Sequence, residues 1–198
     1  MFMSLLHSLK LSALKILKPL VVFVGGLHAP YTHNKITGRE YHRISNALRV
    51  GDVLITRKRG EVTNLFIPGF YTHAAMYVGR NDVVEAIGKG VVRTDLVSFC
   101  MGKDYVAVLR SKFSDEAVNK EAAKEAIKLI GSPYDYDFEP ANVAFYCSEL
   151  CYYAYDKALG EDKSPFELRQ SLGVDTVTPQ DFFDATEKWE RILVTDRG

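Results

Sequence analysis

Three side chains of this sequence could together carry out nucleophilic chemistry: the thiol of Cys147, the imidazole of His73 and the carboxylate of Glu85. A thiol is strongly nucleophilic only as the thiolate, and a neighbouring histidine can take up its proton. A carboxylate beside that imidazole fixes its tautomer and stabilises its protonated form. The three residue types therefore permit attack on an amide or ester carbonyl, provided that folding brings these distant positions together.

The surroundings of Cys147 predict that it lies at the start of a helix. The helical pattern begins near Tyr146 and ends at Gly160, a residue that commonly terminates helices. Unpaired N–H groups and the helix dipole favour an anion at this position, which lowers the pKa of a thiol. The alternative is that Cys147 is a small buried hydrophobic residue, as we expect for Cys151.

His73 is the candidate base because it lies within a predicted β-strand. A single histidine in a strand can equally be structural, so this position alone does not assign the role. The other four histidines lie in the N-terminal segment or in the loop-like stretch after it: His7, His28, His33 and His42.

Glu85 is the candidate partner of His73. Residues 70–78 and 83–87 predict two antiparallel strands joined by a Gly-Arg-Asn-Asp turn. In one register Glu85 lies opposite Ala75, on the same face as His73 and diagonal to it, whereas a slip of one residue places the two on opposite faces. The sequence does not choose between these registers, and Asp82 or Asp95 could replace Glu85.

Further strands and helices are predicted around these residues. A Gly51-Asp52 turn leads into a strand, and a helix is expected from an N-cap at Ser114 to Gly131. Additional strands are expected at 90–96, 105–110 and 189–195, and a short helix is expected after Thr178-Pro179. These elements lie within one predicted domain, residues 48–198.

Residues 1–47 are predicted to be an amphipathic N-terminal helix and extension. The apolar positions of residues 1–17 follow a helical period, Pro19 interrupts it, and the next apolar run is too short to span a membrane. This helix could pack on the domain, form a dimer contact, or lie on a membrane surface through residues 1–24. A cleaved signal peptide fits less well, so we expect a cytoplasmic or peripheral membrane location rather than secretion.

Composition and charge limit the possible partners. The 198 residues are 47% hydrophobic and 25% charged, which is typical of a globular protein, and the formal net charge is zero. Residues 1–60 carry ten Lys and Arg against two acids, so this segment could dock on the acidic remainder or on an anionic surface. No nucleic-acid-binding motif is present. The three cysteines predict neither a disulfide framework nor a zinc site, and we expect no metal or organic cofactor.

Four motifs, taken in order along the chain, resemble those of the circularly permuted papain-like amidases of the NlpC superfamily, the YaeF and YiiX type. The motifs are Gly51-Asp52-Val53-Leu54, residues 71–79 around His73, Val84-Glu85-Ala86, and residues 146–150 around Cys147. The resemblance covers about residues 48–185, and the order His, acid, Cys marks the permutation. It implies Cys147 as nucleophile, His73 as base and Glu85 as the third member. It also implies an α+β, permuted papain-like fold in which a cysteine-bearing helix packs against a small antiparallel sheet or half-barrel.

The expected function is hydrolysis of an amide bond, in a peptide, an isopeptide or an amidated fragment, through a Cys147 acyl-enzyme. One alternative is a lipid acyltransferase or thioesterase that uses the same residues. Another is a catalytically silent module that binds a peptide or lipid, and a third is a redox sensor in which Cys151 resolves oxidised Cys147. The oligomeric state and the role of residues 1–47 are not predicted.

Overall fold

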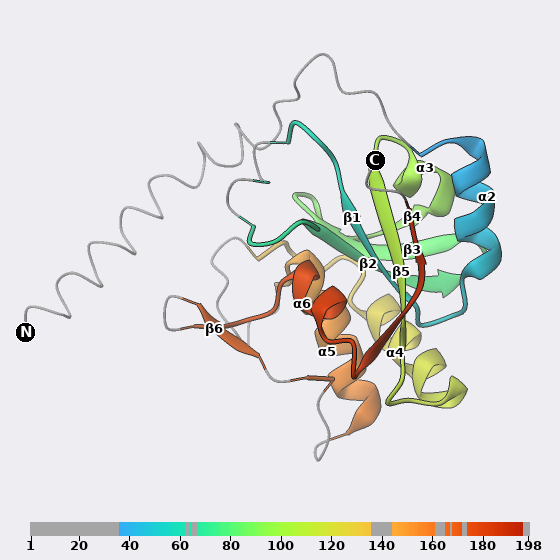
Figure 1. The fold of residues 1–198 in the computed structure, drawn as a ribbon. Helices are drawn as coiled ribbons and strands as arrows, with labels where there is room; N and C mark the ends of the chain where they lie inside the picture. The colour runs from blue at the N-terminus through green and yellow to red at the C-terminus, as the bar shows by residue number, and fades with distance from the viewer. Residues whose placement is uncertain are drawn as a thin grey trace, which may run out of the picture.

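A six-stranded antiparallel sheet forms the centre of the structure, a computed structural model that describes residues 36–195 except 62–63, 65–66, 136–143, 161–164, 167 and 172–173 (Figure 1). The strands lie in the order β4-β3-β2-β1-β5-β8. Their bounds are β1 Val53–Arg57, β2 His73–Gly79, β3 Asp82–Ile87, β4 Gly90–Asp95, β5 Tyr105–Ser111 and β8 Trp189–Val194. The expected α+β class is confirmed, and the C-terminal strand that the sequence predicts closes one edge of the sheet.

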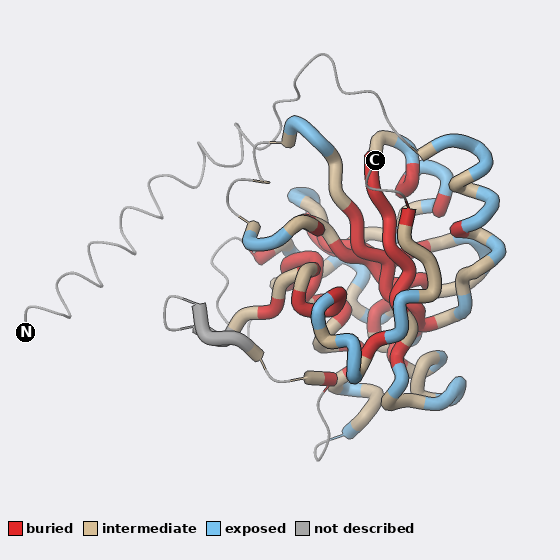
Figure 2. The backbone as a smooth tube through the Cα atoms, in the orientation of Figure 1, coloured by how far each residue is buried: buried red, intermediate tan, exposed pale blue. Residues whose placement is uncertain are grey.

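The central strands of the sheet are buried (Figure 2). Because side chains alternate along each strand, the sheet has two buried faces. Val53, Ala74 and Met76 belong to one hydrophobic cluster, and Leu54 and Ala75 belong to the other. Each cluster is covered by its own set of helices. Because both faces are buried, a strand that slips by one residue would exchange the side chains of two different cores.

Three helices cover the first face: α4 Glu116–Lys128, α5 Cys147–Leu159 and α6 Pro179–Asp184. The predicted start of α4 at Ser114 is wrong by one residue, because Asp115 is the N-cap and its carboxylate accepts a hydrogen bond from the Val118 N–H at 2.9 Å. Helix α5 begins and ends as predicted, with Gly160 in a positive-φ conformation at its C-terminus. Thr178 caps α6, also as predicted.

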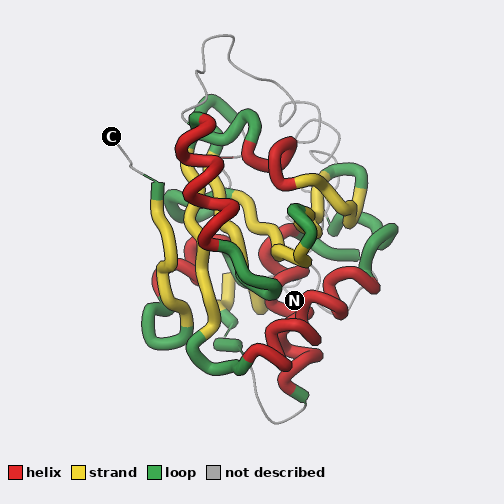
Figure 3. The backbone as a smooth tube through the Cα atoms, turned by 90° about the vertical axis from the view of Figure 1, so that its right-hand side faces the viewer, coloured by secondary structure: helices red, strands yellow, loops and turns green. Residues whose placement is uncertain are grey.

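Two helices that the sequence did not predict cover the second face. Helix α2, Gly38–Ala47, lies nearest the viewer in Figure 3, and α3, Leu96–Cys100, directly follows β4. The loop-like interpretation of residues 38–47 is therefore wrong: Thr37 accepts the Glu40 N–H at 3.3 Å, and Ile44 is fully buried. A separate two-stranded hairpin, β6 Arg169–Ser171 and β7 Val174–Thr176, precedes α6.

Residues 1–35 lie outside the described part of the chain, and with them the predicted amphipathic helix and its membrane contact. Within the described part, none of the helices combines the length and the hydrophobicity that crossing a membrane requires.

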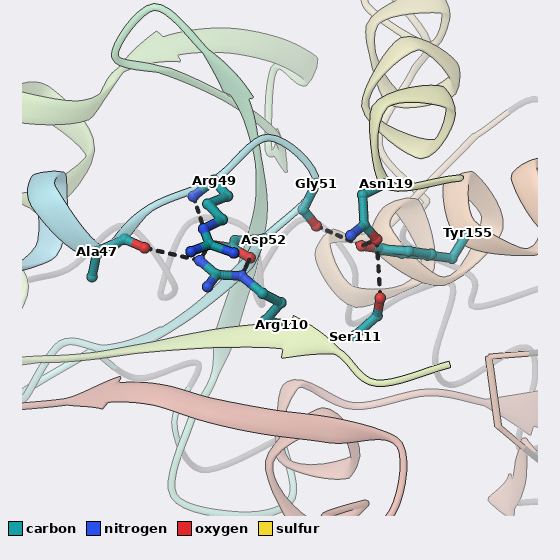
Figure 4. Close-up of polar contacts among 8 residues, drawn as sticks. All are labelled: Ala47, Arg49, Gly51, Asp52, Arg110, Ser111, Asn119 and Tyr155. Carbon is teal, nitrogen blue, oxygen red and sulfur yellow. Dashed lines mark hydrogen bonds and ion pairs between the residues drawn. The ribbon is translucent and has the colours of Figure 1, made fainter. Parts of the chain in front are cut away.

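The turn before β1 is fixed by two groups of polar contacts (Figure 4). Arg110 donates to both carboxylate oxygens of Asp52, at 2.8 and 2.6 Å, and to the Ala47 carbonyl at 2.9 Å, which joins the end of α2 to the sheet. The Tyr155 hydroxyl donates to the Gly51 carbonyl at 2.8 Å. Tyr155 lies on α5, so the helix that begins at Cys147 is attached to the turn that begins β1.

Candidate active site

The pairing of β2 with β3 places Glu85 on the face that carries His73. Glu85 lies opposite Ala75, which is one of the two registers that the sequence left open. A bulge between Tyr77 and Gly79 produces this register, because the pairing of Gly79 with Asp82, continued without a bulge, would set Glu85 opposite Met76. Met76 belongs to the other face. The bulge is therefore the local feature that allows the two side chains to meet.

The imidazole of His73 is hydrogen-bonded to the Glu85 carboxylate, which Thr94 in turn holds in place. His73 Nε2 lies 2.7 Å from Glu85 Oε2, and the Thr94 hydroxyl donates to Glu85 Oε1 at 2.6 Å. Glu85 is 7% exposed, so these bonds form in a site that is largely screened from water. Since Nε2 is occupied by Glu85, Nδ1 is the ring nitrogen that remains for the thiol.

Cys147 is the first residue of α5, as predicted. Tyr146 is the N-cap, and its backbone N–H donates to the Glu149 carboxylate at 3.3 Å. The N–H groups of the first turn have no partner within a helix, so they and the dipole favour a negative charge on the sulfur. Cys147 itself is only 5% exposed.

The thiol meets the sheet where the pairing between β2 and β3 ends. The Cys147 thiol lies near enough to the His73 ring and to the backbone N–H of Ala74 for both groups to lower its pKa. The Tyr77 N–H donates to the Asp52 carbonyl, which lies on the β1 side of β2. Successive N–H groups of a strand point to opposite sides, so the Ala74 N–H points to the β3 side. The pairing with β3 begins one residue later, at Ala75.

These contacts shift the charges of the site towards an ion pair. Burial alone would lower the pKa of His73, but the hydrogen bonds to Cys147 and Glu85 outweigh it and raise that pKa to about 9. Burial would raise the pKa of Glu85, but the hydrogen bonds from His73 and Thr94 bring it down to about 2. Burial also disfavours the Cys147 thiolate, yet the contacts with His73 and Ala74 lower the pKa of the thiol. The arrangement therefore favours a thiolate beside an imidazolium.

Tyr146 and Ser148, on either side of Cys147, both form hydrogen bonds with Val177 in the segment before α6. The Val177 N–H donates to the Tyr146 hydroxyl at 3.0 Å, and the Ser148 hydroxyl donates to the Val177 carbonyl at 2.8 Å. Tyr146 and Ser148 are both buried, so these bonds form away from water. The start of α5 is thereby fixed from both sides of the thiol.

The alternative partners for His73 are engaged elsewhere. Asp82 lies 3.7 Å from Arg93, and Asp95 caps α3 by accepting the Ser98 N–H at 2.9 Å. The other cysteines differ sharply from Cys147, since burial raises the pKa of Cys100 to about 12 and raises that of Cys151 well above its ordinary value.

Sequence reasoning missed two contributors to the site. Thr94 lies diagonal to Glu85 on β4, and strand alternation from residue 90 onwards could have placed it on the same face. The Ala74 N–H could not have been found from residue types, because a backbone donor becomes available only where strand pairing stops.

Comparison with known proteins identifies the family of this chain. Residues 47–193 match the family described as permuted papain-like amidase enzyme, YaeF/YiiX, C92 family. The chain belongs to this family. It resembles the crystal structure of metalloprotein yiiX from Escherichia coli O157:H7, with a TM-score of 0.60, 22% sequence identity, and coverage of 76% of this chain and 97% of that one. At that identity the likeness concerns the fold, and it bears out the expected permuted papain-like architecture.

This chain is also similar to the gamma-DL-glutamyl hydrolase of Bacillus subtilis (strain 168), with 31% identity over 116 residues. The match covers 57% of this chain and 27% of the relative, so the chain corresponds to about a quarter of that protein's length. The family match supports a hydrolase of the papain-like amidase type.

The Escherichia coli structure is described as a metalloprotein. The described residues of this chain do not form a metal-binding cluster. Among them, no three His, Cys, Asp or Glu side chains are grouped so that they could hold a metal ion. His73 Nε2, the ring nitrogen that a metal could have used, is occupied by Glu85.

Proposed function

We propose that this protein is a cysteine amidase in which Cys147 is the nucleophile, His73 the acid–base group and Glu85 the residue that orients His73. The observation that carries the proposal is the 2.7 Å contact between His73 Nε2 and Glu85 Oε2, with the Cys147 thiol near enough to the same ring for its pKa to be lowered. A nucleophile, a base and an orienting group in hydrogen-bond contact are what thiol-based acyl transfer requires.

The reaction follows from the charges of the site. The Cys147 thiolate attacks the carbonyl carbon of the amide and forms a C–S bond, and the carbonyl oxygen becomes an oxyanion. The backbone N–H of Cys147, at the first helical position, is a suitable donor to that oxyanion. The C–N bond then breaks, and the amine leaves with the proton of the His73 imidazolium.

Hydrolysis of the thioester completes the cycle. Neutral His73 accepts a proton from water, the hydroxide equivalent attacks the thioester carbon, and the C–S bond breaks to release the carboxylic acid and regenerate the thiolate. The net change is one amide and one water converted to one acid and one amine. Glu85 stays ionised throughout, because its pKa of about 2 lies far below neutral pH.

The first test measures amide hydrolysis directly. The purified chain is incubated with γ-glutamyl and α-glutamyl p-nitroanilides, probes chosen because the Bacillus relative is named a glutamyl hydrolase. Cys147→Ser and His73→Ala should each lower kcat/KM at least about a hundredfold, the typical contribution of a nucleophile or a general acid–base group. Cys100→Ser, in the second core, is the matched control and should retain activity.

The same experiment separates the alternatives. Activity on a p-nitrophenyl ester of a medium-chain fatty acid, without activity on either anilide, would replace the amidase by a lipid acyl hydrolase that uses the same residues. The enzymatic proposal as a whole would be abandoned if Cys147 reacted with iodoacetamide no faster than free cysteine and His73→Ala left that rate unchanged.

A further inference from the structure

Gln180, the second residue of α6, holds the segment that leads into β2. Its amide oxygen Oε1 accepts the backbone N–H of Phe70 at 3.0 Å and that of Tyr71 at 3.3 Å. Its amide nitrogen Nε2 donates to the Asp184 carboxylate at 2.8 Å, so both ends of the side chain have a matching partner. His73 begins β2 only two residues after Tyr71. One side chain of α6 thus fixes the main chain immediately before the candidate base.

The same segment packs closely on α6. Gly69 has a φ of +99°, and a Cβ added to it would lie 2.4 Å from the Cβ of Gln180, so the two segments approach with no room for a further side chain. The ring of Tyr71 is fully buried, and its centre lies 5.0 Å from that of the Phe183 ring, which is also on α6. Packing and hydrogen bonds therefore agree on the position of residues 69–71 against this helix.

The segment that enters α6 is attached to the nucleophile as well. Both neighbours of Cys147 are hydrogen-bonded to Val177, at 3.0 and 2.8 Å. Thr178 follows, and its N–H and its hydroxyl both donate to the Asp181 carboxylate at 2.7 Å, which closes the first turn of α6. Residues 177–180 therefore form a hydrogen-bonded connection from the start of α5 to the segment before β2.

The reacting groups themselves lie on different elements. Cys147 begins α5, which packs on the first face of the sheet, whereas the His73 ring contacts Phe99 on the second face. Acid–base and nucleophilic groups must be held within about 0.5 Å of their productive geometry to act together. The connection through residues 177–180 sets that geometry by a route separate from the contact between thiol and imidazole.

We propose that Gln180 is a positioning residue that fixes His73 relative to Cys147 through the main chain of Phe70 and Tyr71. This inference rests on the proposed function and adds a residue on which the geometry of the site depends. Gln180 acts on the main chain rather than on the reacting atoms. Loss of its oxygen should therefore weaken the activation of the thiol while the fold is kept.

Gln180→Met tests the proposal because it keeps the length of the side chain and removes the acceptor. The variant should fold, since the Tyr71 ring still packs on Phe183, and urea denaturation checks this. The rate constant for alkylation of Cys147 by iodoacetamide, followed by mass spectrometry of its peptide, should fall about tenfold at neutral pH. The rise of this rate with pH should move to higher pH, because a displaced imidazolium stabilises the thiolate less.

Two matched variants make the result specific to the oxygen of Gln180. Gln180→Glu retains an oxygen that accepts both N–H groups, so its rate should stay within about threefold of the wild-type rate. Asp184→Ala removes the other hydrogen bond of Gln180, at an exposed position, and should leave the rate within about twofold.

A double mutant separates positioning from general destabilisation. If Gln180 acts by placing His73, Gln180→Met should not lower the iodoacetamide rate further once His73 is replaced by alanine, since coupled residues give non-additive effects. Three results would each overturn the role of Gln180: equal losses in the wild-type and His73→Ala backgrounds, a Gln180→Met variant as reactive as the wild type, or a loss as large in Gln180→Glu or Asp184→Ala. A failure of the proposed function is recognised separately, because His73→Ala alone would then leave the rate at Cys147 unchanged.

Discussion

At the scale of single residues, the structure explains why one of three cysteines is suited to nucleophilic chemistry. All three are buried and free, so exposure does not distinguish them. Cys147 differs in lying beside the His73 imidazole and the Ala74 N–H, and these lower the pKa of its thiol while burial raises that of Cys100 and Cys151. Neighbouring groups rather than accessibility thus distinguish Cys147 from the other two cysteines.

Cys147 and Glu85 together set the pH range in which His73 stays protonated. The pKa of His73 is raised to about 9, so the imidazolium is present below that pH and is lost as the pH rises through it. Glu85→Gln removes the negative charge that stabilises the imidazolium, and the pKa of His73 should fall. We therefore expect the alkaline limb of the kcat/KM profile to move to lower pH by about one unit or more.

A control variant separates this effect from a general change in charge. Glu125→Gln removes a carboxylate that pairs with Lys128 at 2.5 Å on the exposed side of α4, and it should leave the alkaline limb in place. An alkaline limb that Glu85→Gln does not move would show that Glu85 has no part in holding the proton of His73.

At the scale of elements, the turn before β1 depends on a glycine that no other residue can replace without strain. Gly51 has a φ of +92°, and a Cβ added to it would lie 2.7 Å from the Asn119 carbonyl oxygen. The contact is with backbone of α4, which cannot rotate away. The turn, α4 and α5 are therefore packed around a position that has no room for a side chain.

Gly51→Ala should lower the free energy of unfolding by about 2–5 kcal/mol, the sum of the cost of a positive φ and the cost of overpacking. Gly102→Ala is the matched control: its φ is +85°, but no atom lies within 4 Å of the added Cβ, so only the backbone cost of about 1 kcal/mol should remain. Urea denaturation of both variants measures the difference. Equal destabilisation would mean that the contact with Asn119 is relieved at no cost.

The sequence predicts the helices and strands of the site better than it predicts the strand register that brings His73 and Glu85 together. Capping residues and hydrophobic alternation identify α5, α6 and the main strands. The register of β2 against β3 depends on a single bulge after Tyr77, and Arg80 and Asn81 both adopt positive φ in the turn that follows. A bulge leaves little trace in residue types, since it reflects the packing of two faces at once. Helix α3, with only five residues, is also too short for its period to be recognised.

At the scale of the whole molecule, one sheet separates two hydrophobic cores, and the candidate site contains residues from both sides of that sheet. The helix that begins with Cys147 packs on the first face, whereas His73 contacts Phe99 of α3 on the second. The thiol reaches the imidazole at the end of the β2–β3 pairing. Proper assembly of the site therefore requires both layers of helices to be docked on the same sheet.

The single tryptophan and one cysteine allow the two cores to be followed separately. Trp189 is buried in the first core, against Tyr155 and Phe182, and Cys100 is buried in the second. Since the two cores share every central strand, we expect the urea midpoint from Trp189 fluorescence to coincide with the midpoint for thiol labelling of Cys100. Labelling of Cys100 at clearly lower urea would show instead that the α2–α3 layer unfolds on its own.

The central claim is that Cys147 exists as a thiolate because His73 is protonated beside it, and ultraviolet absorbance of the thiolate near 240 nm tests this most directly. A pH titration of the native protein should show a Cys147 thiolate already present at neutral pH, well below the ordinary thiol pKa of about 8.5. This absorbance should be absent from Cys147→Ser and should move to higher pH in His73→Ala. A wild-type thiol that titrates in the ordinary range, and does so identically in His73→Ala, would contradict the account.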